Sequence, residues 1–144
     1  MSGLAALLAG RTPPGVYRWH GAFDAVDVRH TVEHAGWRFA HVDGWHGETK
    51  KEFLAAVGEA LGFPEWYGRN LDALADCLRE VRAEESRGTL LLWDGWGPFA
   101  RRDPTAFASA LDALAERAAT GRRGAFAVLL RGEGPEQPDL VSLD

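Results

Sequence analysis

The sequence predicts an α/β fold in which helices pack on a small parallel β-sheet. Apolar segments of strand length, at 16–19, 37–42, 89–93 and 125–130, alternate with longer segments whose apolar residues recur at helical spacing. Strands separated by helices pair in parallel, because each helix carries the chain back to the edge where the previous strand began. The segment 89–93 is apolar almost throughout, which is typical of a strand buried on both faces.

The composition indicates one globular domain with an acidic surface. The chain has 144 residues, of which 46% are hydrophobic and 26% charged, as is usual for a soluble domain with a sizeable core. Its formal net charge is −5. That charge argues against general nucleic-acid binding, which needs a basic surface, and is compatible with a basic protein partner.

Few residues suggest a compartment or a metal. The single cysteine, Cys77, excludes an internal disulfide. The apolar stretch Leu4–Ala9 is too short to span a membrane and has no basic residue before it, unlike a signal peptide. We therefore expect a cytoplasmic protein without membrane association. His30 and His34 have a spacing that can bind a metal, but no third ligand is placed beside them, so we expect neither metal nor cofactor.

The chain is expected to form a single domain over residues 15–131, between a flexible leader (1–14) and a flexible tail (132–144). The domain begins with a βα extension at 15–36. Its strand at 16–19 would add an edge strand to the sheet through a right-handed crossover.

Three helix starts carry recognisable capping residues. Thr49 and Glu52 have the spacing of a capping box. Asn70 is a good N-cap for a helix expected over 71–83, because its side-chain oxygen can accept from amides of the first turn. Pro104 suits the first position of a later helix, where its missing N–H costs nothing.

The helix at 71–83 has two unlike faces. Asp72 and Asp76 lie four residues apart, so two like charges stack on its exposed side at a cost of a few tenths of a kcal/mol. The pattern is either an ordinary solvated face or a surface that meets something basic. Trp66 and Tyr67 precede it, and large aromatics beside charges are typical of protein-binding surfaces. The polar face also contains Arg79 and Glu80, and the apolar face consists of Leu71, Leu74, Cys77, Leu78 and Val81.

The run FPEWYGRNLDALADCL strongly resembles the signature of the barstar family, which are intracellular inhibitors of barnase-like ribonucleases. The upstream HVDG and the downstream TLLLWDGW and AFAVLLRG follow in the same order, so the resemblance covers about residues 37–131. It implies a sheet of three core strands with the strand at 37–42 in the centre, and the strand at 16–19 would be a fourth. It also implies an inhibitor that performs no chemistry of its own.

The resemblance implies a role for several residues of the loop and helix. Asp76 matches the carboxylate that enters the phosphate site of the ribonuclease, and Asp72 matches a neighbouring contact. Trp66 matches the loop aromatic that packs on the ribonuclease. Gly68 and Asn70 match residues that shape or touch the interface from the loop. Tyr67 is expected at the same surface.

Other positions of the same surface depart from the family pattern or align more loosely. Glu116, on the last long helix, matches a further acidic contact. Ala75 and Val81 stand where aromatic residues are expected, and Arg69 replaces an acidic loop residue. These changes reduce the acidity and area of the surface, and they bear on whether barnase itself would be the target.

The sequence suggests three possible functions for the protein. The first is a cytoplasmic inhibitor, monomeric when free, that blocks the active site of a basic ribonuclease. The second is a barstar-like binding module or antitoxin for a different protein. The third, a small enzyme, would need convergent polar groups in a cleft, and the sequence supplies no such motif.

Overall fold

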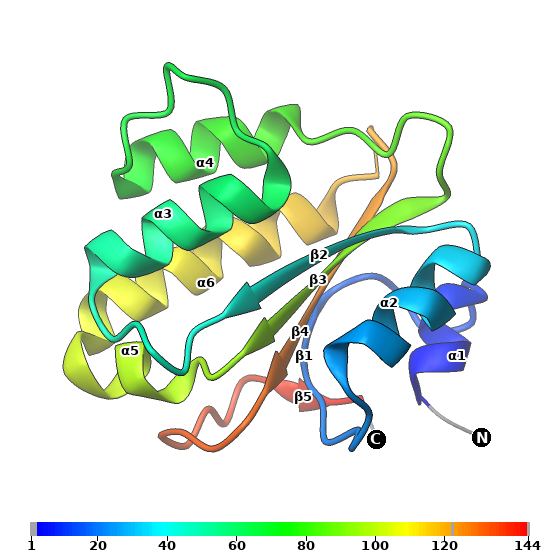
Figure 1. The fold of residues 1–144 in the computed structure, drawn as a ribbon, viewed down its shortest axis with the longest axis horizontal. Helices are drawn as coiled ribbons and strands as arrows, with labels where there is room; N and C mark the ends of the chain where they lie inside the picture. The colour runs from blue at the N-terminus through cyan, green and yellow to red at the C-terminus, as the bar shows by residue number, and fades with distance from the viewer. Residues whose placement is uncertain (1–2, 122, 144) are drawn as a thin grey trace.

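The structure is a computed structural model that describes residues 3–121 and 123–143 (Figure 1). Helices connect the strands of one five-stranded sheet. In chain order the described elements are α1 (Gly3–Leu8), β1 (Val16–Arg18), α2 (Ala25–His34), β2 (Arg38–Asp43), α3 (Lys50–Leu61), α4 (Leu71–Glu80), β3 (Gly88–Asp94), α5 (Gly97–Arg102), α6 (Pro104–Ala119), β4 (Ala125–Arg131) and β5 (Val141–Ser142).

All strand pairs are parallel, and the order across the sheet is β2-β3-β4-β1-β5. The predicted parallel α/β fold is confirmed, but the predicted central position of the strand at 37–42 is wrong, because β2 lies at one edge. Leu91 of β3 lies between Ala40 of β2 and Val128 of β4. Every residue of β3 is buried, whereas β2 exposes both its end residues. A strand is buried throughout only when it has neighbours on both sides and helices on both faces.

Within the described residues, both terminal segments, for which the sequence predicts a flexible leader over 1–14 and a flexible tail over 132–144, contact the rest of the fold. The three leucines of α1 are buried, and the indole of Trp37 donates a hydrogen bond to the Leu8 carbonyl oxygen (3.1 Å). A helix this short is unstable in water by itself, so burial holds it in place. Strand β5 pairs with β1, which therefore lies inside the sheet and not at its edge.

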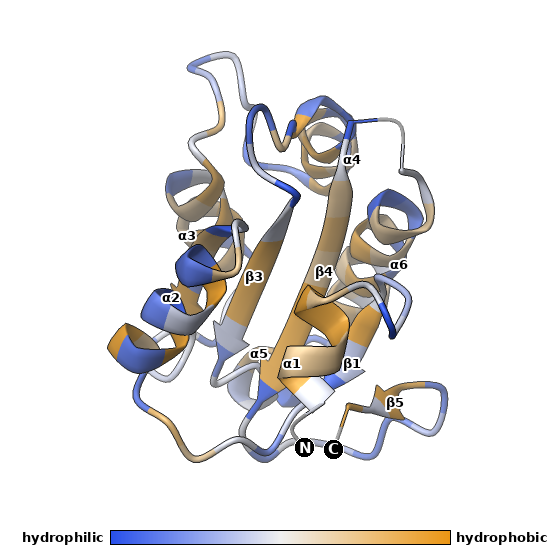
Figure 2. Ribbon diagram, turned by 90° about the vertical axis from the view of Figure 1, so that its right-hand side faces the viewer, coloured by the Kyte–Doolittle hydropathy of each residue, from blue (hydrophilic) through white to orange (hydrophobic). Residues whose placement is uncertain are grey.

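Helices cover both faces of the sheet (Figure 1). Leu91 and Trp93 of β3 point into one core cluster, which α3, α4, α5 and α6 complete. Leu90 and Leu92 point into the other, which α1 and α2 complete. This alternation follows from the two-residue period of a strand, and β3 and β4 form the apolar centre of the molecule (Figure 2). No helix in the described part of the chain is both long and apolar enough to cross a bilayer.

The carboxyl ends of the strands are tied together by Asp94 of β3. Its carboxylate accepts from Arg131 of β4 (2.6 and 3.1 Å) and lies 2.8 Å from the His41 ring of β2. Arg131 also donates to the carbonyl oxygens of Gly21 and Phe23, in the segment after β1. Burial raises the pKa of Asp94, but the hydrogen bonds and charges of Arg131 and His41 outweigh it, so the pKa lies below its usual value. Side chains of the sheet therefore join the carboxyl ends of β2, β3 and β4.

Helix α4 has the facing that its sequence predicts. Leu74, Cys77 and Leu78 are buried, and Leu74 and Leu78 belong to the core cluster shared with α3, α6 and the sheet. The Asn70 side chain caps the helix by accepting from the amide of Ala73 (2.8 Å). The helix ends at Glu80, a few residues before the expected 83.

Replacing Leu74 with Asp should abolish cooperative folding. The side chain is fully buried, and a carboxylate there would have no partner, at a cost of several kcal/mol. The matched control is Asp72→Leu on the exposed face of α4, which should change the unfolding free energy by about 0.5 kcal/mol or less. Chemical denaturation measures both. A soluble, cooperatively folded Leu74→Asp protein would contradict this facing of α4.

Candidate protein-binding surface

The loop that precedes α4 contains an exposed tryptophan. The side chain of Trp66 is 63% exposed. Arg69 has a φ of 53°, in the left-handed region that side chains other than glycine enter at a cost, and it turns the chain into the Asn70 cap. A Cβ at Gly68 would lie 3.1 Å from the Asn70 side-chain nitrogen, so glycine leaves room for that cap. Both Gly68 and Asn70 therefore set the shape of the loop.

Tyr67 anchors this loop to helix α3. Its hydroxyl donates to the carbonyl oxygen of Leu54 (2.9 Å). Its ring meets Phe63 edge to face, with ring centroids 4.9 Å apart, and lies so close to Gly58 that a Cβ there would clash at 2.6 Å. The hydroxyl of Tyr67 is thus already hydrogen-bonded within the protein, so a partner could contact only the exposed part of the residue.

Asp72 and Asp76 lie on the exposed face of α4, opposite its buried leucines. The side chain of Asp76 is 64% exposed. Ala75 is half-buried where α4 approaches α6, and Val81 is buried. The first forms part of a groove wall, and the second belongs to the core cluster.

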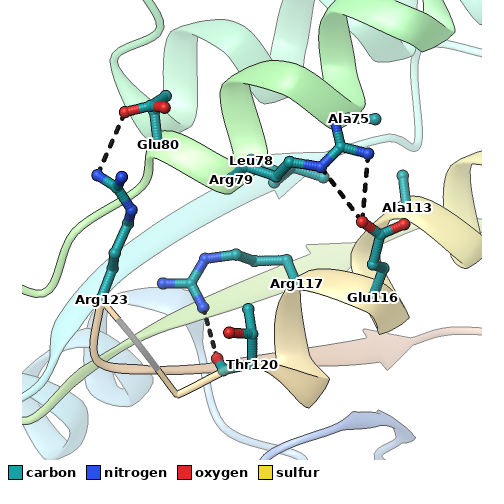
Figure 3. Close-up of a pocket in the computed structure, with 9 residues that line it drawn as sticks. All are labelled: Ala75, Leu78, Arg79, Glu80, Ala113, Glu116, Arg117, Thr120 and Arg123. Atoms are coloured by element: carbon teal, nitrogen blue, oxygen red, sulfur yellow. Dashed lines mark hydrogen bonds and ion pairs between the residues drawn. The ribbon is translucent and has the colours of Figure 1, made fainter.

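Helix α6 brings Glu116 beside α4, and Arg79 links the two helices (Figure 3). One guanidinium nitrogen of Arg79 lies 2.8 Å from an Asp76 oxygen. Its Nε and its other terminal nitrogen both lie 3.2 Å from Glu116 Oε1. The packing of α4 on α6 therefore joins Asp76 and Glu116, which are far apart in the sequence, in one ion-pair network. We call Asp72, Asp76, Arg79 and Glu116 the charged face.

Below the charged face, a groove of about 410 Å³ runs between α4 and α6 (Figure 3). Ala75, Leu78 and Ala113 form its apolar wall. The Glu80–Arg123 ion pair (3.2 Å) lies at the other end of the groove from Arg79 and Glu116.

Arg117, which lines this groove, holds together the ends of α4 and α6. It is almost fully buried and donates to the carbonyl oxygens of Val81 (2.9 Å), Thr120 (3.1 Å) and Gly124 (3.3 Å). Val81 and Thr120 are the C-cap residues of α4 and α6, at the helix ends where the dipole favours a positive charge. Arg117 thus joins the ends of the two helices that carry the charged face.

Sequence reasoning missed the roles of Arg79 and Arg117. Arg79 lies three residues after Asp76, a spacing at which helical side chains meet, so half of its network could have been found. Its bond to Glu116 and all the bonds of Arg117 depend on how α4 and α6 pack. The thiol of Cys77 is buried. Burial, followed by the charges of Asp76 and Glu80, raises its pKa. No three His, Cys, Asp or Glu residues of the described part of the chain group as possible metal ligands.

The geometry defines a three-layer α/β protein in which one helix presents an exposed charged face. A family profile described as "Barstar (barnase inhibitor)" matches residues 37–131. This is more than half of the chain, and the protein belongs to the barstar family. The members of that family are inhibitors, not enzymes. Comparison with curated protein sequences gives no match.

One solved structure of similar fold is the ORC2 protein of Aeropyrum pernix, determined as ADPNP–ADP complexes. The TM-score is 0.57 and the sequence identity is 16%, over 91% of this chain and 38% of that one. This chain therefore spans less than half of the length of that protein. At this identity the likeness concerns the fold alone.

Tyr67→Phe should remove a loss of stability at alkaline pH. Burial, followed by the charge of Cys77, raises the pKa of Tyr67 to about 12, against the opposing charge of Arg69. An unfolded chain releases this proton at about pH 10. Between these values the folded state holds more protons than the unfolded state, so stability is complete below about pH 10 and falls as pH rises towards 12. Unfolding free energies measured from pH 8 to 11.5 should decline less steeply in Tyr67→Phe.

At neutral pH the same variant should be about 0.5–1.5 kcal/mol less stable, because the Leu54 carbonyl loses its donor. Parallel alkaline profiles for the two proteins would show that Tyr67 is not buried as described. Tyr17 also has a raised pKa, so the comparison must be the difference between the two proteins.

Proposed function

We propose that the protein inhibits a small basic ribonuclease by placing its charged face in the active site of that enzyme. The observation that carries the proposal is the exposure of Asp72 and Asp76 on one face of α4, with Glu116 beside them and Trp66 projecting from the preceding loop. The family resemblance assigns Asp76 to the phosphate site of the ribonuclease. Gly68 and Asn70 shape the loop, and Tyr67 and Ala75 border the same surface.

The physical basis of inhibition is mimicry of the RNA backbone. A ribonuclease binds phosphates with Lys, Arg and His side chains, and a carboxylate makes similar charge-assisted hydrogen bonds. Opposite charges on the two proteins accelerate their encounter and make association sensitive to salt. The inhibitor excludes substrate from the site and needs neither catalytic group nor cofactor. We expect it to act as a monomer in the cytoplasm.

The ion pair between Asp76 and Arg79 does not remove this role. Asp76 and Arg79 have side chains that are 64% and 54% exposed, and ion pairs at such exposure contribute about 0–1 kcal/mol. With Asp72 and Glu116 included, the charged face keeps a net charge of −2 (three carboxylates and one guanidinium). A basic partner therefore still meets a negative surface.

The alternative function is a binding module or antitoxin for a protein other than a barnase-type ribonuclease. Three departures favour it: Ala75 and Val81 in place of aromatic residues, and Arg69 in place of an acidic one. Val81 is buried, so it offers no contact area, and Arg69 adds a positive charge beside Trp66. A neighbouring gene that encodes a secreted basic ribonuclease would favour inhibition over this alternative.

Asp76→Ala should weaken inhibition of a barnase-type ribonuclease by about 30-fold or more and leave the fold intact. Removing one partner of a charge pair buried in an interface costs about 2–5 kcal/mol. Glu80→Ala is the matched control, because it removes a carboxylate from the same helix, four residues on, outside the charged face. Inhibition constants measured at about 50 and 300 mM salt give both the effect and its electrostatic share.

The proposal fails if Asp76→Ala inhibits as well as the parent protein, or if Glu80→Ala weakens inhibition equally. If the parent protein does not inhibit any barnase-type ribonuclease but retains another basic protein in a salt-dependent pull-down, the alternative function replaces it.

A further inference from the structure

One guanidinium nitrogen of Arg79 already occupies Oδ1 of Asp76, which is one of the two oxygens that a cationic side chain of the partner would use. Its guanidinium approaches Asp76 Oδ1 to 2.8 Å, the distance of a charge-assisted hydrogen bond. A carboxylate has two oxygens, and a bidentate guanidinium of the partner would use both of them. A partner that directs an arginine at Asp76 in this way therefore has to share Oδ1 with Arg79 or displace it.

The second contact of Arg79 allows such displacement at low cost. Its Nε and one terminal nitrogen contact Glu116 at 3.2 Å, independently of the nitrogen that contacts Asp76. When Asp76 is taken by another cation, Arg79 keeps a carboxylate on α6. All three side chains are more than half exposed, so each contact is weak and water can replace it.

Arg79 also changes the field that a distant partner meets. Without it, Asp72, Asp76 and Glu116 would present a net charge of −3, and with it the charged face presents −2. A diffusing cation therefore meets a weaker attraction and, at Asp76, a carboxylate that is already paired. Both effects act in the same direction, towards slower association and lower affinity.

We propose that Arg79 is an internal competitor for the cation of the partner, a positioning residue that sets how strongly the charged face binds basic proteins. This inference rests on the proposed function for its biological meaning. Arg79 favours partners that direct a guanidinium at Asp76, because their hydrogen bonds to the carboxylate replace the one that Arg79 loses. Partners with only diffuse positive charge, such as a lysine-rich surface, gain a point charge without bidentate geometry and displace Arg79 less well.

The test compares Arg79→Gln with Arg102→Gln, its matched control. Each variant removes one positive charge from an exposed ion pair. Arg102 lies outside the charged face and pairs with Glu48 at 2.9 Å, with both side chains 58% exposed. A third variant, Arg79→Lys, keeps the charge but not the planar fork. Two probes are used: an oligoarginine peptide, which needs no cognate partner, and a barnase-type ribonuclease.

With the peptide at low salt, Arg79→Gln should bind about two- to tenfold more tightly than the parent, the range expected for releasing a surface pair. Arg102→Gln should change affinity less than twofold, and Arg79→Lys should lie between the parent and Arg79→Gln. With the ribonuclease, the same order should appear, chiefly in the association rate constant. A merely structural role of Arg79 would change the thermal midpoint and not this order.

Equal gains for Arg79→Gln and Arg102→Gln with the peptide would show an effect of net charge alone and overturn the inference. So would unchanged or weaker binding by Arg79→Gln. If the peptide shows the expected order while the ribonuclease binds none of the proteins, Arg79 is an internal competitor and the proposed ribonuclease function fails. If the ribonuclease binds the parent and loses affinity with Asp76→Ala, but the two glutamine variants are equal, the function stands and the competitor fails.

Discussion

The burial of one face of α4 determines what its other face can do. Leu74, Cys77 and Leu78 are fixed against the core, and at 3.6 residues per turn this orientation leaves Asp72 and Asp76 in solvent. The charged face is thus a consequence of the same packing that completes the core, so it cannot loosen without loss of stability. A rigid helix also presents its carboxylates with little conformational entropy to lose on binding.

Two arginines act on this surface in opposite environments. Arg117 is buried, joins the ends of α4 and α6 through backbone carbonyls, and holds the two helices side by side. Arg79 is exposed and joins the same helices through carboxylates that a partner could use instead. Arg117 fixes the positions of the two helices, and Arg79 reduces the negative charge of the charged face. Because of this difference in burial, only Arg79 is open to the competition that we propose.

The features predicted correctly from sequence are those fixed by local interactions. The capping box of Thr49 and Glu52 and the cap at Asn70 depend on neighbouring residues, and the structure has both. Strand order is not local, so the central place expected for residues 37–42 belongs instead to β3 and β4. The packing of α1 depends on a sheet face distant in sequence. The contact of Arg79 with Glu116 likewise exists only because α6 lies beside α4.

The most direct test of the account is to map where a barnase-type ribonuclease contacts the protein, by amide hydrogen exchange with and without the enzyme. Added protection should concentrate in the loop at 63–70, the first two turns of α4 and the segment around Glu116. Protection concentrated instead on α1, α2 or the edge strand β2 would place the partner on the opposite side of the molecule or at its border. That result would contradict the claim that the exposed carboxylates of α4 are the binding surface.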